Sequence, residues 1–201
     1  MTQDTPEHKS RRGIYLLPNM FTTAGLFAGF YAIVAAMGGR FEAAAIAIFA
    51  AMIMDGIDGR IARLTRTQSA FGEQYDSLSD MVSFGLAPAL VMYEWSLHAM
   101  ISIGWAKLGW LAAFIYTAGA ALRLARFNMH HDNSVFTGLA SPSAAAIVAG
   151  SVWVFTDGAP TAAGPDGLGA VGLAVLTAGV GLLMVAPIAY WSPKLINLKG
   201  R

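Results

Sequence analysis

The chain has 201 residues, of which 56% are hydrophobic and only 12% are charged. Soluble domains carry charges on about a quarter of their residues, so this composition excludes a soluble domain and indicates a membrane protein. The net charge of +1, from 13 basic and 12 acidic residues, gives no general attraction to nucleic acid. The absence of cysteine excludes disulfides, thiolate nucleophiles and cysteine metal sites.

Six apolar stretches, separated by polar or glycine-rich turns, predict an all-α polytopic membrane protein with six transmembrane helices. The stretches run over residues 13–37, 41–54, 81–95, 108–124, 142–155 and 168–191. These spans and their short connections leave no room for a separate soluble domain. We therefore expect residues 1–12 to form a cytoplasmic N-terminal segment, residues 13–193 the six-helix membrane domain and residues 194–201 a cytoplasmic tail.

Basic residues concentrate on one side of this predicted topology. With the N-terminus inside, every Lys and Arg except Arg40 and Lys107 falls on the cytoplasmic side. Lys and Arg are enriched in the cytoplasmic connections of membrane proteins. We therefore expect a multi-pass protein of the bacterial cytoplasmic membrane, with both termini facing the cytoplasm.

The second apolar stretch is too short to cross a bilayer alone. Its uninterrupted part, residues 43–54, would cover about 18 Å at 1.5 Å per residue. The helix must therefore continue into the polar residues that follow, which places Asp55 and Asp58 in or near the inner half of the bilayer, where ionisable groups need a partner. At 100° per residue, the two acids share one face with Gly59 and Ala62.

A second acidic pair begins the third span. Asp76 and Asp80 are one helical turn apart, and Gly72 and Ser83 fall beside them on the same face. Two antiparallel neighbouring helices can thus bring four aspartates together, and these charges would repel strongly in a low dielectric unless cations or protons neutralised them. Oxygen ligands without His or Cys are typical of Mg²⁺ or Mn²⁺ sites. Arg63 completes the acid-bearing face of the second helix and could contact a phosphate.

The spacing of these residues resembles the signature of the CDP-alcohol phosphatidyltransferase family, D-x2-D-G-x2-A-R-x8-G-x3-D-x3-D. Every signature position is matched, by Asp55, Asp58, Gly59, Ala62, Arg63, Gly72, Asp76 and Asp80. The resemblance covers nearly the whole chain. It implies a homodimer with a cytoplasm-facing cavity in each subunit, where a CDP-linked lipid donates a phosphatidyl group to an alcohol.

The resemblance also implies roles for the signature residues. The first three aspartates would hold two divalent cations, and Asp80 would help at the metals and act as the catalytic base. The CDP part of the donor would lie beside Gly59, Ala62, Arg63 and Gly72. Two divalent ions can neutralise both a diphosphate and the aspartates, which makes CMP a good leaving group.

Three stretches outside the signature resemble the phosphatidylserine synthase branch of the family. They are residues 18–22, residues 79–89, and residues 123–128 with 136–139 and 141–142. This resemblance favours CDP-diacylglycerol as donor and L-serine as acceptor over inositol phosphate, glycerol phosphate or choline. It also places Asn19 and Thr22 near the donor nucleotide, although Pro18-Asn19 could equally be a helix entry.

The acceptor needs both positioning and removal of its hydroxyl proton. Asp80 suits proton removal because it lies nearest the apolar part of the third span, and Ser83 is expected beside the acceptor. Arg123 and Arg126 are helical neighbours on the cytoplasmic side, where a guanidinium can grip the carboxylate of serine. Alternatively, these two arginines and Arg63 only anchor the helix ends at the cytoplasmic surface of the membrane, where basic residues are enriched.

Two other classes of function compete with an enzyme. A divalent-cation channel or transporter also carries carboxylates within the membrane. All four aspartates lie near one surface, however, and no comparable acids continue a path through the outward half. A noncatalytic assembly factor would leave the packed aspartates unexplained.

Overall fold

The computed structural model describes residues 8–65, 69–129, 138–156, 158 and 162–187. The predicted C-terminal tail, most of the predicted N-terminal segment and part of the stretch at 136–142 lie outside these residues. The regular structure of the described residues is all helical, with turns and loops between the helices and no strand among them. The all-α class expected from the apolar stretches is confirmed.

Each predicted apolar stretch corresponds to a helix, but α1 begins at His8, within the predicted N-terminal segment, and α2 extends beyond its stretch. In chain order they are α1 (His8–Met37), α2 (Phe41–Thr65), α3 (Ala70–Asp80), the π-helix η1 (Met81–Leu86), α4 (Ala87–Trp95), the 3₁₀-helix η2 (Leu97–Ile103), α5 (Ala106–Met129), α6 (Ser141–Thr156) and α7 (Gly167–Val185). Since α3, η1 and α4 follow one another without a break, we call residues 70–95 the third rod.

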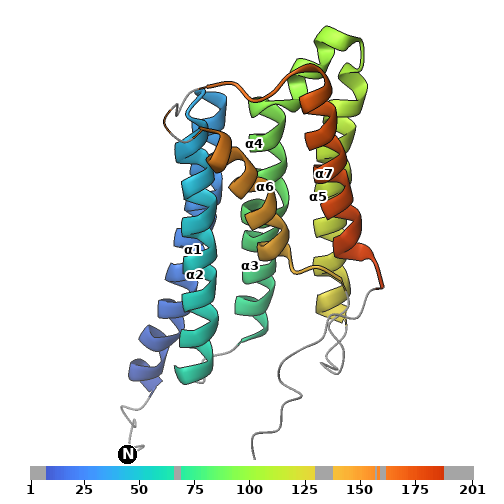
Figure 1. The fold of residues 1–201 in the computed structure, drawn as a ribbon. Helices are drawn as coiled ribbons and strands as arrows, with labels where there is room; N and C mark the ends of the chain where they lie inside the picture. Colours follow the sequence, from blue (N-terminus) through green and yellow to red (C-terminus); the bar gives the residue numbers. More distant parts are fainter. Residues whose placement is uncertain (1–7, 66–68, 130–137, 157, 159–161, 188–201) are drawn as a thin grey trace, which may run out of the picture.

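Helices α1, α2, α5 and α7 and the third rod lie roughly parallel to one another. In Figure 1, α1 and α2 lie together on one side, α5 and α7 lie together on the other, and the third rod stands between the two pairs. Helix α6 packs against α2 and α4. Small residues permit close packing of such helices: a Cβ atom on Gly119 of α5 would collide with the backbone of Gly181 of α7.

Among the residues that the structure describes, three helical segments are long and apolar enough to cross a membrane. They are Asn19–Met37, Lys107–Met129 and Gly167–Val185. The long apolar helices support a multi-pass membrane protein, and six membrane crossings remain a prediction. Helix α2 extends to Thr65, so the predicted continuation of the second helix beyond its apolar part is confirmed.

The third rod begins before the apolar stretch at residue 81, which agrees with the prediction that Asp76 and Asp80 lie on the first turns of the third helix. Ser69 starts it as an N-cap, accepting a hydrogen bond from the Gly72 backbone N–H at 3.0 Å. The rod continues through Asp80 into α4. The polar residues on which Asp76 and Asp80 lie are therefore the first turns of the helix itself.

The π-helix η1 directly follows Asp80, and its end has a local cause. Pro88 has no N–H to donate to the carbonyl of Phe84, four residues earlier. The hydroxyl of buried Tyr116 donates to that carbonyl instead, at 2.9 Å. The backbone N–H of Ala87 reaches back five residues to Val82. Such π-helical turns are common at functional sites because they re-aim side chains.

Candidate active site

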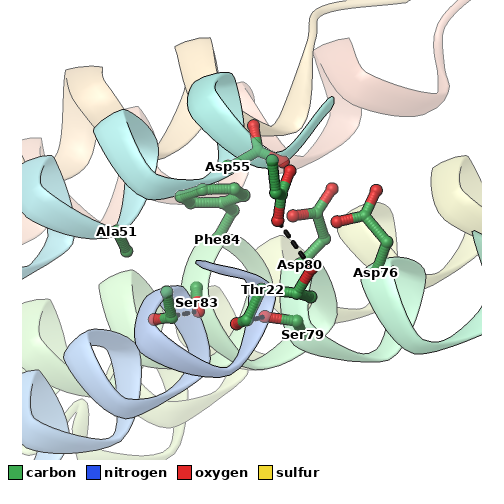
Figure 2. Close-up of a pocket in the computed structure, with 10 residues that line it drawn as sticks. Thr22, Ala51, Asp55, Asp76, Ser79, Asp80, Ser83 and Phe84 are labelled. Atoms are coloured by element: carbon green, nitrogen blue, oxygen red, sulfur yellow. Dashed lines mark hydrogen bonds between the residues drawn. The ribbon is translucent and has the colours of Figure 1, made fainter. Parts of the chain in front are cut away.

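A pocket lies between α1, α2 and the third rod. Its lining combines four acids, three hydroxyls and small or apolar residues: Thr22, Gly25, Ala51, Asp55, Asp58, Asp76, Ser79, Asp80, Ser83 and Phe84. Figure 2 shows the side chains of Asp55, Asp76 and Asp80 converging from α2 and α3. The structure thus brings together the two acidic pairs that the sequence placed on separate helices.

Three of the four aspartates form a tight group. One carboxylate oxygen from each of Asp55, Asp76 and Asp80 lies within 4.8 Å of the other two, and all three side chains are half-buried. Like charges at such distances repel strongly when partly removed from water. Oxygens on opposite sides of one Mg²⁺ ion would be about 4.2 Å apart, given ligand distances of about 2.1 Å. The three carboxylates therefore offer oxygen ligands of the kind a hard cation takes, close to one another in the pocket.

Asp58 lines the same pocket but is held differently. Its side chain is only 4% exposed, and its Oδ2 accepts a hydrogen bond from the Thr22 hydroxyl at 2.7 Å. A carboxylate has a second oxygen, so Asp58 can accept from Thr22 and still offer Oδ1 to a cation. Its predicted role as a metal ligand stays a prediction.

Hydroxyl groups connect α1 to the third rod beside the acids. Ser79 Oγ donates to the carbonyl of Thr22 at 3.2 Å, and Ser83 Oγ donates to the carbonyl of Gly25 at 3.1 Å. Tyr75 adds a hydrogen bond of 2.9 Å between its hydroxyl and that of Thr23. The spacing of 75, 79 and 83, one helical turn at each step, was a signal in the sequence. The sequence contained no signal of the α1 groups to which these side chains hydrogen-bond.

Ser83, the predicted acceptor contact, therefore has a structural hydrogen bond. Its side chain is 2% exposed, although it lines the pocket. A Cβ atom on Gly29 would lie 2.7 Å from the Ser83 Cα atom, so glycine is needed for α1 to approach this closely. Contact between Ser83 and an acceptor stays a prediction.

The residues predicted to border the nucleotide lie apart from the pocket lining, except for Thr22. Arg63 is exposed and donates from Nε to the Gly59 carbonyl at 2.8 Å. A Cβ atom on Gly72 would lie 3.6 Å from Asn19 Oδ1, so these two residues face each other across α1 and α3. Ala62 is half-buried on α2, one turn beyond Asp58.

The two arginines predicted to bind the acceptor have different partners. Arg123 Nη1 donates to Ser141 Oγ on α6 at 3.1 Å, whereas Arg126 Nη1 donates to the Val185 carbonyl on α7 at 3.4 Å. Arg123 Nε is buried and has no hydrogen-bond partner among the described residues. Of the pair, Arg123 is therefore the arginine that has a buried donor still available to a ligand.

Comparison with known proteins adds to this geometry. The family model described as CDP-alcohol phosphatidyltransferase matches residues 15–191. A CDP-diacylglycerol--serine O-phosphatidyltransferase of Helicobacter pylori (strain J99) is 38% identical over 138 residues, covering 67% of this chain and 56% of the relative.

Two further relatives carry related names. The enzyme of Mycobacterium leprae with the same name is 38% identical over 156 residues, covering 73% of this chain and 50% of the relative. An archaetidylserine synthase of Methanothermobacter thermautotrophicus is 32% identical over 135 residues, covering 66% of this chain and 55% of the relative. The chain spans about half the length of the curated relatives it matches.

Proposed function

Because the chain belongs to the CDP-alcohol phosphatidyltransferase family, we propose that it transfers the phosphatidyl group of CDP-diacylglycerol to the hydroxyl of L-serine, giving phosphatidylserine and CMP. It would thereby act in phospholipid biosynthesis. The proposal depends on one observation: the carboxylates of Asp55, Asp76 and Asp80 lie close together in the pocket. The names of the relatives support serine as the acceptor.

The reaction exchanges one bond to phosphorus for another. The serine oxygen bonds to the phosphorus that carries diacylglycerol, and the bond from that phosphorus to the CMP oxygen breaks. CMP leaves with the electron pair, and the hydroxyl proton passes to a carboxylate. Asp80 is proposed as this base because it lies in the pocket beside Asp55 and Asp76, directly before the π-helix Met81–Leu86, in which Ser83, Phe84 and Gly85 are buried.

Four residues are proposed to hold two divalent cations, Mg²⁺ or Mn²⁺. They are Asp55, Asp58, Asp76 and Asp80, all of which line the pocket. When bound, the cations supply positive charge to the diphosphate and to the departing CMP. The carboxylates themselves fix where that positive charge lies.

The donor nucleotide is proposed to extend from the pocket along α2 and α3. The residues placed there are Asn19, Gly59, Ala62, Arg63 and Gly72. Arg63 is exposed on this side and supplies a cation for a phosphate oxygen. The glycines allow the nucleotide to approach the helix backbone closely.

The acceptor is proposed to enter between the third rod and α5. Arg123 would bind its carboxylate, with Arg126 as a weaker alternative, while its hydroxyl points toward Asp80. Ser83 lines the aspartate pocket, into which the acceptor hydroxyl would point. Ser77 and Asn128 connect α3 to α5 near the site by a hydrogen bond of 3.1 Å, which limits the distance between the two helices.

The proposed topology has six membrane crossings, with residues 13–193 forming the membrane domain. Residues 1–12 and 194–201 would be cytoplasmic in a bacterial cytoplasmic membrane, since the basic residues concentrate on that side. A homodimer is proposed from family membership. Each subunit would carry its own pocket, because all four aspartates belong to one chain.

Release of CMP from CDP-diacylglycerol by the purified full chain tests the proposal. L-Serine should support release in the presence of Mg²⁺ or Mn²⁺, whereas inositol phosphate, glycerol phosphate and choline should not. Release with one of these other acceptors would change the proposed substrate. Absence of release with every acceptor, together with cation movement into protein-containing vesicles, would favour the transporter.

A further inference from the structure

Thr22 contacts both acid-bearing helices from the inner half of α1. Its hydroxyl donates to Asp58 Oδ2 of α2 at 2.7 Å, and its backbone carbonyl accepts from Ser79 Oγ of α3 at 3.2 Å. Ser79 immediately precedes Asp80 in the chain. Figure 2 shows Thr22 between Ser79 and the aspartates. One residue of α1 therefore connects an acid of α2 to the neighbour of an acid of α3.

These hydrogen bonds are removed from water. Thr22 and Ser79 are each 5% exposed, and Asp58 is 4% exposed. A hydrogen bond to an ionised carboxylate is shorter and stronger than one between neutral groups. When a buried partner is lost, the remaining group keeps its full desolvation penalty. The contact between Thr22 and Asp58 thus fixes the carboxylate in one orientation.

The same contact limits what else Thr22 can do. A threonine hydroxyl has a single hydrogen to donate, and here that hydrogen points to Asp58. The resemblance of this stretch to the serine branch instead placed Thr22 beside the donor nucleotide. A nucleotide phosphate would need the same hydrogen, so the two roles compete.

We infer that Thr22 is a positioning residue for the metal site: it orients Asp58 and sets the spacing between the aspartates of α2 and those of α3. The inference rests on the proposed function, because it assumes that the aspartates bind a divalent cation. Groups that orient metal ligands typically change metal affinity by about 10- to 100-fold when removed. In this role Thr22 acts through Asp58 rather than by its own contact with the cation or the donor.

The experiment compares Thr22→Val with Thr22→Ser. Valine keeps the branched shape and loses the hydroxyl, whereas serine keeps the hydroxyl and loses the methyl group. Mn²⁺ binding is measured directly, by paramagnetic resonance titration of the purified full chain without donor lipid. Thr22→Val should raise the Mn²⁺ concentration for half-saturation by about 10- to 100-fold, and Thr22→Ser should stay within about threefold of the unaltered protein.

A second measurement separates positioning from nucleotide contact. The KM for CDP-diacylglycerol, taken at saturating Mn²⁺, should be the same for Thr22→Val and the unaltered protein. Ser79→Ala removes the neighbouring contact and should weaken Mn²⁺ binding as well. It provides a second test if Thr22→Val does not fold.

The inference is overturned if Thr22→Val binds Mn²⁺ normally, if the serine variant is as weak as the valine variant, or if the donor KM rises while Mn²⁺ affinity is unchanged. It is overturned too if the unaltered protein binds no Mn²⁺. A protein that binds Mn²⁺ but releases no CMP would contradict the proposed function alone. In that case the Mn²⁺ titrations still decide the role of Thr22.

Discussion

Replacing Arg123 with alanine should impair the use of serine far more than replacing Arg126. Arg123 is half-buried and donates to Ser141 on α6. Arg126 is exposed and donates to the carbonyl of Val185 at the end of α7. The two arginines are neighbours on α5, so Arg126→Ala is a control for loss of one positive charge at the same membrane surface.

The expected magnitude follows from the environment of the Arg123 guanidinium. Its Nε is buried and has no hydrogen-bond partner among the described residues, so a carboxylate ligand could satisfy a donor that the protein does not. Loss of a charge-assisted hydrogen bond costs about 1.5 to 3 kcal/mol. This corresponds to a serine requirement raised about 10- to 150-fold. Arg126→Ala should change it by less than about threefold, as expected for an exposed charge.

The assay measures CMP release against serine concentration at saturating CDP-diacylglycerol and Mn²⁺. Arg123→Lys should restore only part of the affinity, because an ammonium group lacks the planar fork of a guanidinium. Ethanolamine, which lacks the carboxylate, should be a poor acceptor for the unaltered protein. Equal effects of the two alanine variants, or ethanolamine used as well as serine, would refute carboxylate recognition by Arg123.

Three further predictions concern the acids and the π-helix. Asp80→Asn should lower turnover by about 10²- to 10⁴-fold while CDP-diacylglycerol still binds; loss of donor binding with unchanged turnover per bound donor would make Asp80 chiefly a metal ligand. Asp76→Asn should abolish metal-dependent CMP release, whereas Glu73→Gln, on the exposed side of the same helix, should retain it; full activity in chelator would reject the metal site. Tyr116→Phe should lower the free energy of unfolding by about 1 to 3 kcal/mol, because it leaves the buried Phe84 carbonyl without its donor. Denaturant unfolding in detergent measures this loss, and equal stability would contradict the assigned role of the hydroxyl.

Much of the fold followed from local patterns in the sequence. The glycine pair after Met37 ends α1, and Gly39 adopts a positive φ of 70° in the turn to α2. The short apolar part of the second stretch required a longer helix, and α2 extends to Thr65. Such features depend on residues close together in the chain, so composition and periodicity were sufficient to predict them.

The aspartate group was also predictable, but its arrangement was not. Spacing within α2 and within α3 placed each acidic pair on one helical face. The rotation of one helix against the other decided that Asp55, Asp76 and Asp80 form the close group while Asp58 turns to Thr22. A pattern within one helix carries no information about that rotation.

The same limit applies to the two arginines. Their three-residue spacing put them on one side of α5, and this suggested a single site for a carboxylate. The structure assigns their side chains to different neighbours, α6 for Arg123 and α7 for Arg126. Long side chains can diverge from adjacent backbone positions, so helical proximity alone did not define the acceptor site.

The contacts that the sequence did not reveal share one physical origin. Lipid tails are as apolar as the helix surfaces, so hydrophobic burial does little to fix the rotation of one membrane helix against another, and close packing and polar contacts take over. In this protein Gly29 lets α1 approach the third rod closely. The hydroxyl groups of Ser79 and Ser83 donate hydrogen bonds to backbone carbonyls of α1. These bonds lie in the pocket lining itself. The interactions that set the position of α1 therefore also set the positions of Asp58 and Asp80, so a change in the packing of α1 should alter the chemistry of the site.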